Sequence, residues 1–457
     1  MGALSLFGML LGVIVFVLLA FKAFNLQLSA LIASVVMLIF AGSITLGSGD
    51  AATTYFGIDA VYQGVFNTWV SGVAGALKTY FFLLCGGAVF GQLLADGGAT
   101  KSIAFALVDL VNKPKNPAVR RLFAAAFVPT MYIILSFVGI SGFVIVFTVL
   151  GIGYELYKQL NVPWRLYCMG GASCASTILV GGAIQASNVA AAKITGTNSL
   201  TAGMGISLVG FILYYIVLIL MLWFELKAAE KKGEGFMDTG AEFDKTGASG
   251  GSRENIPPII LSIIPFILVI LLCAAFKVDT GLSLIIGCVV TIALFWKNIN
   301  RASNIKKSVS SGMVGSFPPL MSVCCAVALG SVLKVLPGFA YLNQLLTNLP
   351  PLIAGSALSA VLSFIMASST SAIPAMGSVI HEKFMEAGLS PAMSHRFMLM
   401  SSAPFGIMFH NAGVVNTSSL AKVPYKKAVS VYCRYSCLPA LPGMFICLFL
   451  ILAGVLK

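Results

Sequence analysis

The stretch LSFVGISG at residues 135–142 has a counterpart in the second half of the chain, LSFIMASSTS at residues 362–371. A polar break follows each copy, QASN at residues 185–188 and HNAG at residues 410–413. Polar, Gly-rich interruptions at corresponding places in two apolar halves are typical of secondary transporters whose site lies between inverted repeats. The sequence therefore predicts an inverted repeat with two re-entrant hairpins and two broken transmembrane helices.

Composition places these repeats in a membrane. Hydrophobic residues make up 58% of the chain and charged residues 9%, whereas soluble domains average about 25% charged residues. An all-α polytopic membrane protein is expected, because several apolar runs reach the roughly 20 residues that cross a bilayer. These runs cover residues 4–21, 26–46, 202–224, 256–276 and 437–456. The first is too long for a signal-peptide core and is expected to be retained.

The net charge of +13 comes from Lys and Arg clustered in short loops, where they act as topology signals. Nucleic acid is therefore not expected as a partner. The connection at residues 48–59 carries Asp50 and Asp59 and no basic residue. With the basic loops in the cytoplasm and this acidic connection outside, both termini are expected outside.

The spans and breaks predict two repeats joined by a linker. The repeats cover residues 1–224 and 256–457, and a flexible, Gly/Ser-rich cytoplasmic linker covers 225–255. The first repeat divides into scaffold 1–96, hairpin 122–150, broken helix 164–193 and helix 202–224. The second divides into scaffold 256–335, hairpin 351–380, broken helix 395–420 and helix 437–456. Residues 58–72 are expected to form a separate amphipathic helix at the outer interface, before a span at 73–95.

The hairpin tips are the first candidate binding site. Helix N-termini bind anions without a basic side chain, and hydroxyl and carbonyl oxygens can coordinate alkali ions. Small residues in membrane helices can instead merely allow close packing, but their recurrence in both repeats favours a site. The predicted substrate-binding residues of the tips are Ser136, Gly139, Ser141, Ser368, Ser369, Thr370 and Ser371.

The broken helices carry polar residues that cannot comfortably face lipid. They are Gln185, Ser187 and Asn188 in the first half and His410, Asn411, Asn416 and Thr417 in the second. His410 is the only titratable side chain expected near the middle of the membrane. Its reference pKa of about 6.5 suits a proton-coupled step, although a lone buried His is often structural. If the coupling ion is Na⁺, its expected ligands are Ser369, Thr370 and Asn188.

Several functional classes have little support. All fifteen Asp and Glu are expected in loops or at helix ends, which argues against a proton pump or Na⁺/H⁺ antiporter with a carboxylate at depth. No phosphate-binding loop or hydrolase motif occurs, and the ten cysteines have no ligand partners at metal-binding spacing. An intramembrane enzyme would have only His410 beside hydroxyls. No enzyme activity, metal or cofactor is therefore expected.

Several motifs resemble known sequences. Residues 86–99, GGAVFGQLLADGGA, resemble the third span of the gluconate permease family, in the ion transporter superfamily. The segments SSTSAIP at 368–374, GLSPAMSHR at 388–396 and FHNAGV at 409–414 resemble its D-beta-hydroxybutyrate permease branch. The Gln185-x-x-Asn188 pattern also resembles that branch.

This resemblance implies uptake of small organic anions across a bacterial inner membrane, usually with protons. It also implies an elevator mechanism, a homodimer, and a site made by the two tips with Gln185, Asn188, His410 and Asn411. The chain departs from gluconate transporters in having apolar Phe137-Val138 where they carry Glu. It also has Val180-Gly181-Gly182 where they are Pro-rich, and both departures favour a smaller, less hydroxylated acid.

The expected function is proton symport of a small monocarboxylate, a hydroxy acid or short-chain acid such as 3-hydroxybutyrate or gluconate. Units 122–193 and 351–420 would slide against a scaffold of the remaining spans. The alternative is a Na⁺-coupled carboxylate symporter or a Na⁺/H⁺ antiporter of the same superfamily. A channel is less favoured, because paired re-entrant tips suit alternating access.

Overall fold

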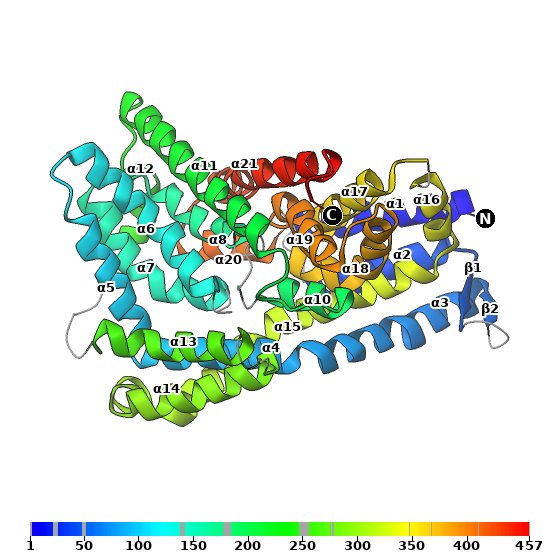
Figure 1. The fold of residues 1–457 in the computed structure, drawn as a ribbon, viewed down its shortest axis with the longest axis horizontal. Helices are drawn as coiled ribbons and strands as arrows, with labels where there is room; N and C mark the ends of the chain where they lie inside the picture. Colours follow the sequence, from blue (N-terminus) through cyan, green and yellow to red (C-terminus); the bar gives the residue numbers. More distant parts are fainter. Residues whose placement is uncertain are drawn as a thin grey trace.

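The computed structural model describes most of the chain. The described residues are 2–21, 26–47, 52–137, 142–176, 183, 185–245, 256–274, 276, 278–346, 348–366, 368–409 and 411–456. Helices dominate them, which confirms the all-α polytopic prediction (Figure 1). The structure adds one antiparallel hairpin of β1 (Ser43–Leu46) and β2 (Thr53–Phe56). β2 lies in the expected connection 48–59, whereas β1 occupies the end of the run 26–46 that was expected to be a span.

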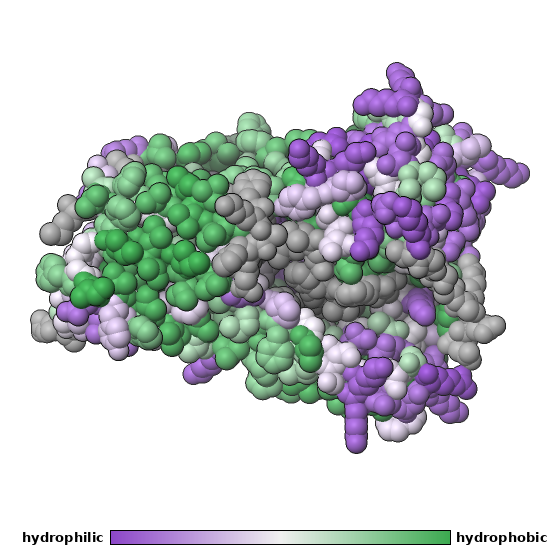
Figure 2. Space-filling model, turned by 180° about the vertical axis from the view of Figure 1, so that it is seen from behind, coloured by the Kyte–Doolittle hydropathy of each residue, from purple (hydrophilic) through white to green (hydrophobic). Residues whose placement is uncertain are grey.

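Six helices of the described part are long and apolar enough to cross a membrane. They lie at Gly57–Asp96, Pro117–Phe137, Met204–Lys231, Thr280–Ala302, Ile305–Val335 and Tyr425–Leu452. The face in Figure 2 carries a broad hydrophobic surface, and hydrophilic side chains gather at the end that carries α5 and α12 in Figure 1. The chain is thus a multi-pass membrane protein.

The two halves contain a similar succession of long and short helices, although their 3₁₀ helices stand at different places. The first half contains α1 (Gly2–Phe21), α2 (Leu26–Ile39), α4 (Val70–Asp96), α5 (Ala99–Val111), α6 (Pro117–Phe137), α7 (Gly142–Gln159), η3 (Trp164–Cys168), α8 (Met169–Ser173), α10 (Ala186–Thr195) and α11 (Met204–Lys231). The second half contains α13 (Ile259–Ala274), α14 (Thr280–Ala302), α15 (Ile305–Val335), α16 (Pro337–Leu346), α17 (Pro351–Met366), α18 (Ser369–Glu386), α19 (Pro391–Ser402), η4 (Ala403–Phe405), α20 (Ala412–Leu420) and α21 (Tyr425–Leu452). The inverted orientation of the halves in a membrane stays a prediction.

The segment before α4 differs from expectation. α3 (Gly57–Gln63), the π-helical η2 (Gly64–Trp69) and α4 run on as one helix of 40 residues, so residues 58–72 do not form a separate helix. The apolar side chains Val61, Val65 and Trp69 are only partly exposed, because this stretch packs against α2 and α15. A π-helical turn absorbs extra residues without ending a helix.

The helices group into two bodies by their packing. The long helices α4 and α15 pack along each other, and α1, α2, α14 and α16 pack onto them or onto one another. The pairs α6–α7 and α17–α18 pack with the segments around α8, α10, α19 and α20. We call these groups the α4–α15 body and the hairpin body.

The helices α11 and α21 belong to the hairpin body. They pack on each other, and their other main contacts are with α6, α8, α19 and η4. Gly210 and Gly443 allow this crossing, because a Cβ added at Gly443 would lie 3.1 Å from the Gly210 Cα. The expected scaffold of all remaining spans therefore does not match the packing of these two helices.

The linker was expected to be flexible throughout, and its first part is instead folded. α11 continues to Lys231, and α12 (Met237–Asp244) follows. Phe236 and Phe243 are buried, with ring centroids 5.7 and 5.1 Å from that of Trp164. The Gly/Ser run that suggested flexibility begins beyond α12 and lies in residues 246–255, outside the described residues.

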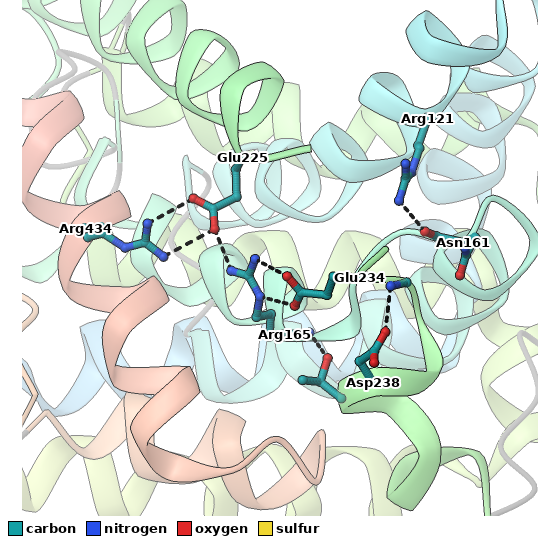
Figure 3. A network of polar contacts seen from close by, with 9 residues as sticks. Arg121, Asn161, Arg165, Glu225, Glu234, Asp238 and Arg434 are labelled. Carbon is teal, nitrogen blue, oxygen red and sulfur yellow. Dashed lines mark hydrogen bonds and ion pairs between the residues drawn. The ribbon is translucent and has the colours of Figure 1, made fainter. Parts of the chain in front are cut away.

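Ion pairs hold this folded part against η3, α11 and α21 (Figure 3). Arg165 contacts Glu234 through Nε at 2.5 Å and through Nη2 at 2.9 Å, and Glu225 through Nη1 at 2.7 Å. Arg434 Nη1 lies 2.9 Å from the other Glu225 oxygen. The Arg165 hydrogen bonds lower the pKa of the Glu234 carboxyl. The first half of the linker is thereby joined to the hairpin body.

Candidate functional site

The first hairpin tip is bonded to the break that follows it in the chain. α6 ends at Phe137, just after the buried Ser136, and α10 begins at Ala186 with extended Gln185 as its N-cap. Gln185 Nε2 donates to Ser136 Oγ at 2.6 Å. The predicted tip residues Gly139 and Ser141 lie outside the described residues. The structure thus brings Ser136 and Gln185 together as predicted site residues.

The second tip is bonded to its own break in a similar way. Ser369 opens α18 and is buried, and its Oγ donates to the carbonyl of Ser402, the last residue of α19, at 3.2 Å. A Cβ added at Gly406 would lie 2.1 Å from Ser369 Oγ, so a larger residue there would displace the Ser369 hydroxyl group. Ser368 and Thr370 are partly exposed, and Ser371 continues α18.

Asn188 connects the two halves. Its side chain is fully buried, and Nδ2 donates to the carbonyls of Ala183 at 2.7 Å and Ser199 at 2.9 Å. Its Oδ1 lies 2.8 Å from His395 Nε2 and accepts from Arg396 Nη1 at 2.9 Å. Because a guanidinium can only donate, the amide orientation is determined.

Arg396 is a fully buried cation. Besides Asn188, its Nη2 donates to the Ser199 carbonyl at 2.8 Å and its Nε donates to the Ala202 carbonyl. Within the described ranges, no carboxylate lies at ion-pair distance from it. Burying an unpaired charge is costly, and only the dipoles of carbonyl and amide oxygens offset the cost here.

His395 is fully buried beside Arg396. Its Nδ1 lies 2.7 Å from Thr197 Oγ1, which lies 2.8 Å from Thr195 Oγ1. Thr195 Oγ1 in turn donates to the Ala191 carbonyl at 2.8 Å. A chain of hydrogen bonds therefore runs from α19 into α10.

Sequence reasoning missed this pair. His410 was expected to be the only titratable side chain near the middle of the membrane, and it lies outside the described residues. The structure shows that His395 and Arg396 are also buried inside the protein. The sequence did carry a signal. His395-Arg396 stands shortly after a Ser390-Pro391 helix start and directly before an apolar run, where charged residues are rare.

The other predicted residues have local surroundings. Ser187 is fully buried, and its Oγ has no hydrogen-bond partner in the described part of the chain. Asn411 caps α20, its Oδ1 accepting from the Gly413 N–H at 2.6 Å. Thr417 Oγ1 lies 2.8 Å from the Tyr432 hydroxyl, and the Asn416 side chain is not among those described.

Within the described ranges, no group of three or more His, Cys, Asp or Glu side chains is arranged to hold a metal ion. The nine cysteines whose side chains are described form no disulfide with one another.

Comparison with known proteins finds similarity to transporters. No protein-family model matches the chain. It is 23% identical over 405 residues to the uncharacterized transporter YxjC of Bacillus subtilis (strain 168), covering 78% of this chain and 83% of that protein. The crystal structure of the Alcanivorax borkumensis YdaH transporter, described as having an unusual topology, aligns with a TM-score of 0.49 at 16% identity. That alignment covers 97% of this chain and 98% of that one.

Proposed function

We propose that the protein is a secondary active transporter that takes up a small organic monocarboxylate by proton symport. The observation that carries this proposal is Arg396, a buried cation between two interrupted helices with no carboxylate partner in the described chain. A guanidinium and a carboxylate form a strong, charge-assisted pair. A carboxylate substrate in this region would offset the charge that the protein itself leaves unbalanced.

The helix starts of the hairpin body also support an anion site. The helices α10, α18 and α20 each begin at an interruption of the hairpin body. Free N–H groups at a helix start carry a partial positive charge and favour anions. Ser187 near the start of α10 and Ser369 at the start of α18 are buried hydroxyl groups beside such N–H groups. The substrate would therefore bind near these helix starts and the tips.

Similarity to a named transporter supports the class. The match to YxjC covers most of both chains. The 3-hydroxybutyrate and gluconate substrates, the homodimer and the bacterial inner membrane rest on the resemblance seen in the sequence and belong to this proposal.

Two separately packed bodies support an elevator movement. The largest direct contact between them lies along α15 and α18, where Lys334 Nζ donates to Ser378 Oγ at 3.3 Å, and α5 packs both on α4 and on α6 and α7. A hairpin body that carries α11 and α21 could slide along α15 without breaking the Arg165–Glu225–Arg434 ion pairs, which lie within it. This division replaces the scaffold expected from the sequence.

The transport assay tests this proposal. Purified protein in liposomes is given labelled 3-hydroxybutyrate or gluconate under an inward proton gradient or an inward Na⁺ gradient. Uptake of the smaller acid driven by the proton gradient is expected. Uptake driven only by Na⁺ would replace the coupling ion, and no uptake of either acid would contradict the substrate class.

Arg396→Ala in the same assay tests the central residue. It is expected to abolish uptake, because the anion loses its counter-charge. Lys101→Ala, at an exposed side chain of α5, is the matched control and should transport normally. Normal uptake by Arg396→Ala would contradict the proposed anion site.

A further inference from the structure

The number of hydrogen atoms available to the hydrogen bonds around His395 depends on whether its ring is neutral or protonated. Four contacts form one chain: His395 to Asn188, His395 to Thr197, Thr197 to Thr195, and Thr195 to the Ala191 carbonyl. Each contact needs one hydrogen. Two hydroxyl groups supply one hydrogen each, and the ring supplies one when neutral or two when protonated.

The first contact determines which ring nitrogen carries hydrogen in the neutral form. Asn188 Oδ1 faces Arg396 Nη1, which can only donate, so this atom is an acceptor and His395 Nε2 must bear hydrogen. The neutral ring then has a bare Nδ1 that accepts from Thr197. Thr195 can donate either to Thr197 or to the Ala191 carbonyl, so one of the four contacts lacks a hydrogen.

The protonated ring removes that shortage. Nδ1–H then donates to Thr197, Thr197 donates to Thr195, and Thr195 donates to the Ala191 carbonyl. All four contacts, at 2.7 to 2.8 Å, are satisfied in one direction. The site is therefore built to accept one more proton, by turning two hydroxyl groups and moving no helix.

The charges around the His395 ring determine under which condition that proton binds. Arg396 lies on the same helix and shares Asn188, so its charge opposes a second positive charge on His395. On α18, His381 Nδ1 contacts Ser394 at 2.6 Å, and Lys193 on α10 is exposed. No described Asp or Glu is fully buried among these helices. A negative charge brought beside Arg396 would remove the repulsion.

From this geometry we propose that His395 is the proton-binding group of transport, with Thr197 and Thr195 as the hydroxyl pair that stabilises its protonated form. The inference rests on the proposed carboxylate transport and names its coupling site. An arriving carboxylate offsets Arg396 and makes protonation of His395 favourable, so anion and proton bind together. Protonation forms one Nδ1–H bond, the Nε2–H bond stays in place, and no other covalent bond of the protein forms or breaks.

Two assays on the same liposomes separate coupling from binding. His395→Gln cannot take up a second proton. It is expected to retain exchange of labelled for unlabelled 3-hydroxybutyrate without a gradient and to lose accumulation driven by a proton gradient. Accumulation by His395→Gln with the wild-type pH profile would overturn the inference. Failure of the wild-type protein to exchange any carboxylate would instead be failure of the proposed function.

The Thr197 pair guards against a variant that does not fold. Thr197→Val removes the acceptor for Nδ1–H, and the pH at which uptake is half-maximal is expected to fall by about one unit. Thr197→Ser keeps the hydroxyl group and should keep the wild-type pH profile. An unchanged profile in Thr197→Val would overturn the role of the hydroxyl pair, since a merely structural Thr would alter stability and leave the midpoint alone.

Discussion

Asn188 is the residue at which the two halves of the chain meet. Its one side chain contacts a carbonyl of its own segment, the turn after α10, and two side chains of α19. Both the nitrogen and the oxygen of the amide are used twice, so no other residue type of this size satisfies all four contacts.

Asn188→Leu tests this junction at nearly constant volume. The change leaves the buried groups of His395 and Arg396 without a shared acceptor, at about 1–3 kcal/mol for each unsatisfied group. The unfolding midpoint in detergent is expected to fall, and carboxylate uptake to be lost. Asn67→Ala, on the exposed face of η2, is the control. Wild-type stability of Asn188→Leu would show that the junction contributes little.

At the scale of elements, each hairpin touches the interruption that follows it. The contact in the second half is tight, because Gly406 leaves no room for a side chain next to Ser369. The tip and the break should therefore move together. Gly406 thus lets the segment after α19 lie directly against Ser369, the first residue of α18.

Gly406→Ala is expected to displace Ser369 and slow transport, since its Cβ would lie 2.1 Å from the hydroxyl oxygen. Adding Ser369→Ala removes that oxygen and should restore part of the rate. The double variant would then transport faster than expected from adding the losses of the two single variants, as is typical of residues in direct contact. Additive losses, measured as initial uptake rates, would contradict direct contact.

The folded part of the linker offers a second test. Phe243→Ala removes a buried ring from the Trp164 cluster, at a cost of about 3 kcal/mol. Amide hydrogen exchange of α12 should lose roughly a hundredfold of its protection. Glu242→Gln is the control, because the Glu242–Lys245 pair is 70% exposed on both sides. Unchanged protection in Phe243→Ala would mean that the ring does not hold α12 in place.

The same element should respond to acid. The pKa of Glu234 is lowered by Arg165, so the pair stabilises the folded linker fully above the ordinary carboxyl range of about 4.3. That contribution is lost only as the pH falls through the lowered value. Protection of α12, corrected for intrinsic exchange, should thus persist at pH 5 and decrease in stronger acid. Glu234→Gln should remove this acid step.

At the scale of the whole molecule, the elevator proposal requires the two bodies to slide. Lys334→Cys with Ser378→Cys, in a background with the ten native cysteines replaced by alanine, places thiols on α15 and α18 across the contact. A short thiol cross-linker should stop uptake, and cleaving it should restore uptake. Lys383→Cys with Glu386→Cys, one turn apart on α18, is the control. Undiminished uptake after cross-linking of the first pair would contradict sliding at this contact.

The sequence could predict the helical elements because their signals are local. Apolar runs mark the spans, and the stretches 135–142 and 362–371 begin within α6 and α17 and end within α7 and α18. It also placed Asn188 and Gln185 among the candidate residues, because polar groups inside apolar runs need partners. The linker prediction was wrong for α12. The Gly/Ser run indicated flexibility, but the buried rings of Phe236 and Phe243 anchor α12.

The sequence alone determined that this is a helical membrane protein, since composition and periodicity measure how each residue tolerates water. The relation between its two interrupted halves stays a prediction. Only the tertiary structure decided that His395 and Arg396 meet Asn188, 207 and 208 positions away. It also decided that α11 and α21 pack on the hairpin body. A hydrophobic pattern predicts that a face is buried. It does not predict which distant segment covers that face, because burial against any apolar segment removes the same area from water.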